Sequence, residues 1–226
     1  MLVLWLECSW GWVVTPDDST FEERIDFLAS LNAREAKENR ISKQVFFLGN
    51  CGTGKTYATK VFLEKLLDNL GRSYDAERKL LTSWDVAILD LNGEYEKIGA
   101  FPIVDGRENP LWPYRSYTDP WVLLEHLKPQ TVMVIEEALS VDIDDKKLIK
   151  ALRELCTRRR HKKVIPITTS QRARNIPKPL LSTANYLALF STPVAEDLRF
   201  LQGFANFDPE EVKDRQQGEF SIHKIT

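Results

Sequence analysis

The segment with the clearest chemical signature matches the pattern G-x-x-x-x-G-K-[ST] at every defined position, from Gly49 to Thr56. Glycines let such a loop wrap around an anion so that several backbone N–H groups point inward. In this motif the lysine, here Lys55, reaches the β- and γ-phosphates of a nucleotide, and the hydroxyl of Thr56 would bind Mg²⁺. The predicted phosphate-binding loop consists of Gly49, Asn50, Cys51, Gly52, Thr53, Gly54, Lys55 and Thr56.

The residues on either side of this loop fit the strand and the helix that it needs. Residues 45–48 are a short apolar run rich in strand-forming residues. An apolar stripe at helical spacing follows the loop: Ala58, Phe62, Leu63, Leu66, Leu67 and Leu70. A glycine-rich turn before an ordinary helix is the alternative, but the complete motif between a strand and a helix favours phosphate binding.

Two adjacent carboxylates, Glu136 and Glu137, follow the apolar run at residues 131–135. After a strand of this kind, one acid binds Mg²⁺, usually through water, and the next orients the water that attacks the γ-phosphate. Paired acids can instead complement the amino end of a helix. With a phosphate-binding loop upstream, we favour the catalytic interpretation, in which Glu136 shares Mg²⁺ with Thr56 and Glu137 acts on the attacking water.

Another polar group follows the apolar run at residues 86–91. Asp90, Glu94 and Tyr95 would stand at the carboxyl edge of a parallel sheet, where α/β proteins bind their ligands. Turn formation by Asn92 and Gly93 explains the same residues equally well, so both interpretations stay open.

The remaining apolar runs predict an α/β fold with a mainly parallel sheet. Strands are expected at residues 164–171, at 186–190, and, after a turn, at about 217–222. Helices are expected from the turn at Pro16 to about Glu38, at 121–127, and from about Asp144 to a basic cluster at 158–163. That cluster complements a helix dipole and proves nothing by itself, whereas Gln171, at a strand end, would lie beside the phosphates.

Length and composition fit one domain that buries a full core. The chain has 226 residues, of which 43% are hydrophobic and 28% charged, with a formal net charge of -2. These values exclude a disordered chain and a uniformly basic protein, although basic groups can gather on one surface. Three scattered cysteines predict neither a disulfide framework nor a zinc site. The apolar residues 1–6 are too few to span a bilayer, so no transmembrane segment is expected there.

Two aromatic segments carry alternatives. Trp5, Trp10 and Trp12 could stack on nucleic acid, but alternating aromatics are more often half-buried sheet residues. Residues 101–121 hold four prolines and are expected to form a surface excursion rather than a helix or a central strand. In that excursion Arg107 and Arg115 could contact nucleic acid, although packing of the loop on its own domain is at least as good an explanation.

The order of these motifs resembles the HerA/FtsK family of DNA-translocating ATPases over about residues 42–224. The resemblance adds the spacing from Arg160 to Ser170-Gln171-Arg172 and a late Gly218-Glu219 strand. It implies a RecA-like P-loop NTPase core with a mainly parallel sheet flanked by helices, and ATP and Mg²⁺ as ligands. It also implies that Arg160 reaches the ATP site of a neighbouring subunit, with Arg158 and Arg159 as alternatives, and that Gln171 is a polar sensor.

The compact size resembles the genome-packaging ATPases of tailless, membrane-containing viruses. The resemblance implies a ring, expected to be a hexamer, that drives double-stranded DNA into a capsid and contacts capsid or virion vertex proteins. The expected location is the host-cell cytoplasm or the virion. Residues 1–40 would be an extension packed on an ATPase domain at 41–226. A cellular or plasmid DNA pump, and an ATP-dependent assembly or export protein, are the alternatives; a small-molecule kinase lacks supporting motifs.

Overall fold

The structure is a computed structural model that describes residues 19–38, 43–71, 73–74, 80–81, 84–90, 92, 95, 114–137, 145–176 and 178–225. The predicted N-terminal tryptophan strand, Glu94 and Arg107 lie outside the described residues. The division of the chain at residue 40 stays a prediction. Among the described residues, no helix has both the length and the apolar character needed to cross a membrane.

The described strands form a seven-stranded sheet in the order β5-β4-β6-β7-β1-β8-β9, and a separate pair, β2-β3. All neighbours from β5 to β8 are parallel, and β9 is antiparallel to β8. The strands are β1 (Val45–Leu48), β2 (Ser73–Tyr74), β3 (Leu80–Leu81), β4 (Asp85–Leu89), β5 (Tyr114–Tyr117), β6 (Thr131–Ile135), β7 (Val164–Ser170), β8 (Tyr186–Phe190) and β9 (Phe220–Lys224). The mainly parallel sheet predicted from the sequence is therefore confirmed.

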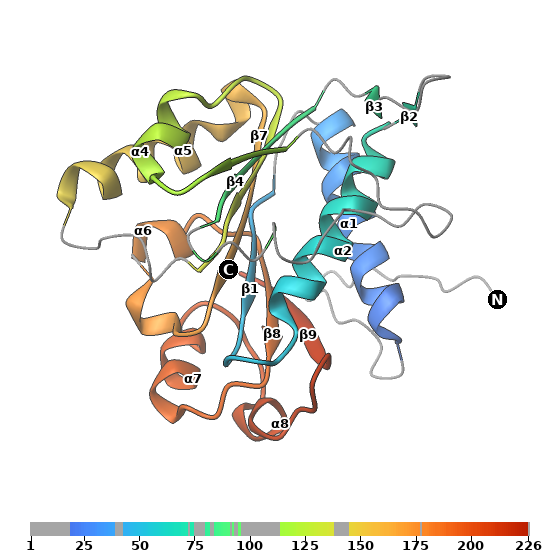
Figure 1. Cartoon of the computed structure of the whole chain (residues 1–226). Helices are drawn as coiled ribbons and strands as arrows, with labels where there is room; N and C mark the ends of the chain where they lie inside the picture. Colours follow the sequence, from blue (N-terminus) through green and yellow to red (C-terminus); the bar gives the residue numbers. More distant parts are fainter. Residues whose placement is uncertain are drawn as a thin grey trace.

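Helices cover both faces of this sheet (Figure 1). On one face lie α1 (Phe21–Glu38) and α2 (Lys55–Asn69), side by side. The other face carries α4 (Pro120–Glu125), α5 (Lys146–Lys162), α6 (Lys178–Leu181), α7 (Ala195–Leu201), α8 (Pro209–Lys213) and the 3₁₀ turn η2 (Ala173–Asn175).

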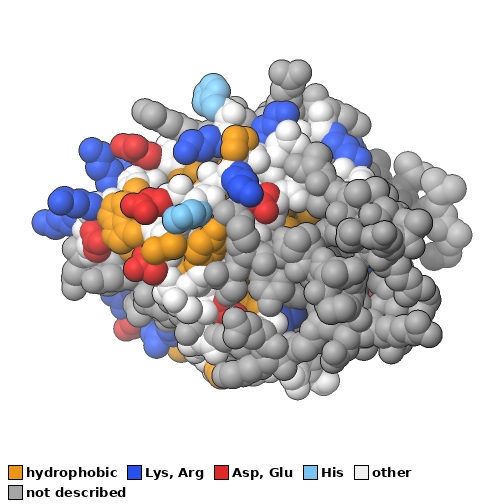
Figure 2. All heavy atoms as spheres, turned by 45° about the horizontal axis from the view of Figure 1, so that its top comes forward, with side chains coloured by type: hydrophobic (Ala, Val, Ile, Leu, Met, Phe, Trp, Pro, Cys, Tyr) orange, Lys and Arg blue, Asp and Glu red, His pale blue; other side chains and the backbone are white. Residues whose placement is uncertain are grey.

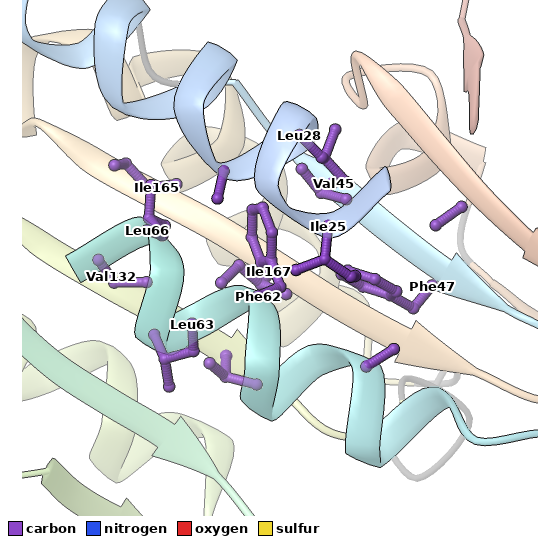
Figure 3. Close-up of a cluster of buried hydrophobic side chains, with 14 of the residues drawn as sticks. Ile25, Leu28, Val45, Phe47, Phe62, Leu63, Leu66, Val132, Ile165 and Ile167 are labelled. Carbon is purple, nitrogen blue, oxygen red and sulfur yellow. The ribbon is translucent and has the colours of Figure 1, made fainter. Parts of the chain in front are cut away.

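The alternation of strand side chains explains the two layers. In β1, Val45 and Phe47 pack under α1 and α2, whereas Phe46 and Leu48 pack toward the opposite helices. Because every residue of β1 is buried, the strand reads as a continuous apolar run, as expected for a parallel strand covered on both faces. Figure 3 shows the first of these clusters, where Phe62 of α2 and Ile25 of α1 meet the sheet.

Helix α1 begins with a capping box. The Thr20 backbone N–H donates to Glu23 Oε2 at 2.8 Å, and the Glu23 N–H donates to Thr20 Oγ1 at 3.3 Å. Its apolar stripe, which includes Ile25, Leu28 and Ala29, is fully buried in the same core as α2. The predicted helix is thus present, and it packs in the same core as α2 and one face of the sheet.

The proline-rich segment differs from its prediction at its end. Residues 114–117 form β5, which pairs in parallel with β4 at the edge of the sheet. An edge strand pairs on one side only, so prolines nearby are tolerated. Pro120 then begins α4, where a proline needs no hydrogen-bond partner for its nitrogen, and the Asp119 side chain caps the helix.

His223 on β9 makes the stability of the fold depend on pH. Burial and the positive charge of Arg215 lower the pKa of His223 from 6.5 to about 4. Between these values the unfolded chain binds more protons than the folded chain, so the free energy of unfolding decreases as the pH falls from about 6.5 to about 4. Burial is incomplete, so the loss is at most about 3 kcal/mol.

We expect His223→Gln to remove most of this pH dependence, because glutamine cannot take up the proton. The measurement is urea unfolding at pH 7.0 and 4.5 for wild type and variant. His161→Gln, at an exposed position on α5, is the matched control and should behave like wild type. An unchanged pH dependence in His223→Gln would contradict the assignment.

Candidate functional site

The loop between β1 and α2 is held by the strands on both sides of β1. The Gly49 N–H donates to Ser170 O of β7 at 3.2 Å, and the Asn50 N–H donates to Ser191 O after β8 at 2.9 Å. A methyl group at Gly49 would lie 2.5 Å from Phe190 Cβ, so only glycine fits there. Gly54 has φ 97°, which an L side chain rarely adopts. Hydrogen bonds and close packing therefore hold the loop in a defined conformation.

Lys55 lies inside this loop. The residue is only 7% exposed, and its Nζ donates to Asn50 O at 2.8 Å. Thr53 Oγ1 donates to the same carbonyl at 2.9 Å. Asn50 and Cys51 are exposed at the tip of the loop. A buried ammonium at the amino end of α2 makes the loop strongly attractive to anions.

A chain of hydrogen bonds joins the loop to the ends of β4 and β6. Thr56 Oγ1 donates to Glu136 Oε1 at 2.8 Å, and Tyr95 Oη donates to Glu136 Oε2 at 3.0 Å. The Tyr95 N–H donates to Asp90 Oδ2 at 3.0 Å. Lys60 Nζ lies 4.7 Å from the centroid of the Tyr95 ring. Both carboxylates are almost fully buried, so these donors compensate for their loss of water.

The two residues predicted to share Mg²⁺ are therefore in direct contact. Hydroxyl and carboxylate oxygens are the ligand types that Mg²⁺ prefers, and Mg²⁺ typically takes only one or two carboxylates and completes its shell with waters and phosphates. Thr56 and Glu136 fit that pattern. Among the described residues, no group of three or more His, Cys, Asp or Glu side chains is placed to hold a metal ion.

Glu137 lies beside the end of β7. Its N–H donates to Thr169 Oγ1 at 2.8 Å, and its Oε1 accepts from the Gln171 N–H at 3.3 Å and from Ser170 Oγ at 3.4 Å. Glu137 has φ 51°, an uncommon backbone conformation for a residue with a side chain. The structure thus places the Glu137 carboxylate beside the Gln171 backbone, where β7 ends, and an uncommon backbone conformation such as that of Glu137 is typical of functional sites. The roles of both residues stay predictions.

Arg160 is not brought to this edge. Its backbone belongs to the last turn of α5, where Lys162 O accepts from the Gln130 N–H just before β6 begins. β7 then runs for 7 residues to reach the loop. At about 3.3 Å per residue, the Arg160 backbone lies roughly 20 Å from the phosphate-binding loop of its own chain.

The structure adds contacts that the sequence did not predict. Tyr95, one of the candidates left open, contacts Glu136 through its hydroxyl group. The fully buried Asp197 of α7 binds the Arg172 guanidinium, with Nε to Oδ2 at 2.6 Å, and accepts from the Arg174 N–H at 3.0 Å. The Gly218 N–H donates to Thr53 O at 3.0 Å. In the sequence, Asp197 resembles an ordinary acid in the first turn of a helix, so its burial could not be predicted.

No protein-family model matches the chain, and no curated protein sequence matches it either. Among solved structures, it is similar to the genome packaging NTPase B204 from Sulfolobus turreted icosahedral virus 2. The sulfate complex is 22% identical with a TM-score of 0.61, over 82% of this chain and 92% of that chain. The AMP complex is 23% identical with a TM-score of 0.59, over 80% and 92% of the two chains.

The pCW3 conjugation coupling protein TcpA, solved as a monomer form with ATPgS, is also similar. It is 13% identical with a TM-score of 0.52, over 82% of this chain and 61% of that chain. At these identities the likeness shows the fold. The P-loop NTPase fold that the HerA/FtsK resemblance implied is therefore confirmed.

The pair formed by Arg172 and Asp197 should stabilise the fold rather than act in chemistry. Arg172→Ala would leave a fully buried carboxylate without its guanidinium, and we expect the free energy of unfolding to fall by about 1–3 kcal/mol. Arg174→Ala is the matched control, because its pair with Glu196 is exposed on both sides and should contribute less than about 1 kcal/mol. Urea unfolding measures both; equal losses would contradict the anchoring role.

Proposed function

We propose that the protein is an ATPase that binds ATP with Mg²⁺ in the loop from Gly49 to Thr56. The observation that carries this proposal is the 2.8 Å hydrogen bond from Thr56 Oγ1 to Glu136 Oε1. It joins the end of the phosphate-binding loop to the acid at the end of β6, two residues 80 positions apart in sequence. This pairing is the arrangement in which P-loop NTPases hold the metal of their nucleotide.

Each residue of the site then has a role that its contacts support. Lys55 would exchange its bond to Asn50 O for oxygens of the β- and γ-phosphates. Mg²⁺, when bound, would neutralise charge on these phosphates. Tyr95 would keep the Glu136 carboxylate turned toward Thr56, since it donates to the other carboxylate oxygen. Glu137 would orient the attacking water, and Gln171, whose N–H binds Glu137, would sense the γ-phosphate.

We further propose that ATP hydrolysis drives translocation of double-stranded DNA, and that the DNA is a viral genome entering a capsid. Two structures of similar fold support this: B204 is a genome packaging NTPase, and TcpA is a conjugation coupling protein. The match covers 92% of the B204 chain, so the two chains have similar extents. Such a protein would work in the host-cell cytoplasm at a capsid or virion vertex. A cellular or plasmid pump would use the same chemistry.

The DNA contact would be a small part of the surface. Exposed Lys146, Lys147 and Lys150 lie on the first two turns of α5, and Arg107 and Arg115 are the other candidates. On the described part of the face in Figure 2, basic side chains are interspersed with acidic ones around an apolar area. A motor that steps along DNA needs only a few phosphate contacts for each subunit, so binding should be weak, salt-dependent and indifferent to sequence.

ATP turnover with and without DNA tests this proposal. We expect double-stranded DNA to stimulate hydrolysis at low salt and the stimulation to disappear at high salt. Lys55→Ala should lose nucleotide binding. Glu137→Gln should bind ATP but hydrolyse it at least about 100-fold more slowly, because the Glu137 carboxylate is proposed to orient the attacking water. Turnover that ignores DNA would favour an assembly or export ATPase, and normal turnover in Glu137→Gln would contradict its role.

We also propose that the subunits form a ring, expected to be a hexamer, in which Arg160 completes the ATP site of the next subunit. The Arg160 backbone lies near the amino ends of the parallel strands, and the phosphate-binding loop lies at their carboxyl ends. This separation argues against action within one chain. A head-to-tail contact that brings these two ends together forms a ring when its rotation closes. An arginine supplied in this way contributes about 10³–10⁵ in rate.

Mixed rings test the role of Arg160. We expect Arg160→Ala to keep ATP affinity, lose turnover, and inhibit wild-type subunits with which it is mixed. Mixing it with Glu137→Gln should restore part of the activity, because some interfaces receive the intact residue from each parent. If no mixture recovers turnover although the subunits exchange, the role in trans is wrong. If Arg160→Ala is fully active, Arg158 and Arg159 are the next positions to test.

A further inference from the structure

Tyr57 is an aromatic side chain left in solvent beside the phosphate-binding loop. It directly follows Thr56 in the first turn of α2, and it is 62% exposed, more than the other exposed large apolar side chains of the described residues, Trp121 and Val122. Its ring centroid lies 5.7 Å from that of Phe21, at an interplanar angle of 31°. The exposed surface of this ring is apolar area that a ligand could cover.

The order of strands indicates which end of a nucleotide would lie near Tyr57. Glu136 and Glu137 follow β6, and Gln171 follows β7, so the groups proposed to act on the γ-phosphate all lie on one side of β1. On the other side of β1 lie β8 and β9. A nucleotide with its γ-phosphate on the first side must extend its sugar and base away from it, toward the second.

The residues on that second side form a supported surface. The Phe21 ring packs edge-on against Phe220 of β9, with centroids 5.6 Å apart, and Phe220 is buried. The turn before β9 touches the loop itself, since the Gly218 N–H donates to Thr53 O at 3.0 Å. Tyr57 therefore packs on the Phe21 ring, which is held against β9 by Phe220. The turn that precedes β9 lies beside the phosphate-binding loop.

We propose that Tyr57, supported by Phe21, stacks on the base of the bound nucleotide. This inference rests on the proposed nucleotide site and adds the base contact to it. Stacking acts through the π-face that every base has, so Tyr57 would strengthen binding without selecting strongly for adenine. The support would come from α1, a helix outside the segment that carries the phosphate-binding motif.

Comparison of ATP with inorganic tripolyphosphate, which has the phosphates but no base, isolates this contact. In the presence of Mg²⁺, we expect Tyr57→Ala to weaken ATP binding about 5- to 100-fold, the range of a lost stacking contact. Its affinity for tripolyphosphate should stay within about twofold of wild type. Tyr57→Trp should retain ATP affinity, because it keeps an aromatic face. Titration calorimetry on the full chain measures each of these affinities.

The controls separate this inference from the proposed function. Trp121→Ala removes an exposed aromatic from α4, on the opposite face of the sheet, and should bind both ligands like wild type. If Tyr57→Ala binds ATP normally, or loses ATP and tripolyphosphate equally, the stacking role is wrong while the nucleotide site stands. If wild type binds neither ligand, or Lys55→Ala binds both normally, the nucleotide site itself is wrong and the stacking role falls with it.

Discussion

The parallel pairing of β1 on both sides is the constraint on which the rest of the structure depends. Because β7 and β8 run in the same direction as β1, the carboxyl ends of all three strands meet at one edge of the sheet. The loop that leaves β1 is consequently bounded by Ser170 on one side and Ser191 on the other, and both accept hydrogen bonds from it. Within one chain, Lys55 and Thr56 follow the loop after β1, Glu136 and Glu137 follow β6, and Gln171 follows β7, so all of them lie at this edge.

Gathering polar groups at a buried edge has an energetic cost that the local hydrogen bonds offset. Lys55, Asp90 and Glu136 are each less than a tenth exposed, and each carboxylate accepts at least one hydrogen bond. In a region of low dielectric these charges act strongly on a bound anion and its metal. Because hydrogen bonds hold the carboxylates of Asp90 and Glu136, these two groups would need little reorganisation during a reaction.

The sequence predicts the elements that depend on local patterns and misses those that depend on distant partners. The apolar runs locate β1 and β8 at their observed bounds, and the loop motif locates the start of α2. By contrast, the contact between Tyr95 and Glu136 joins residues 41 positions apart, and nothing in either local sequence demands it. The short helices α7 and α8 were not predicted either. Their positions follow from Asp197 and Val212, whose burial becomes apparent only once the sheet has formed.

The contact of Gly218 with the loop also has a consequence for the order in which the protein acquires its parts during synthesis. Gly218, which precedes β9, hydrogen-bonds to Thr53 of the loop. During synthesis the loop therefore leaves the ribosome about 160 residues before this partner does. A nascent chain that has emerged only as far as α7 already carries Lys55 and Thr56 but still lacks Gly218 and Phe220. Contacts between such distant segments form late, because the closure of a long loop must come first. The loop therefore gains this contact only after the residues that precede β9 have been made.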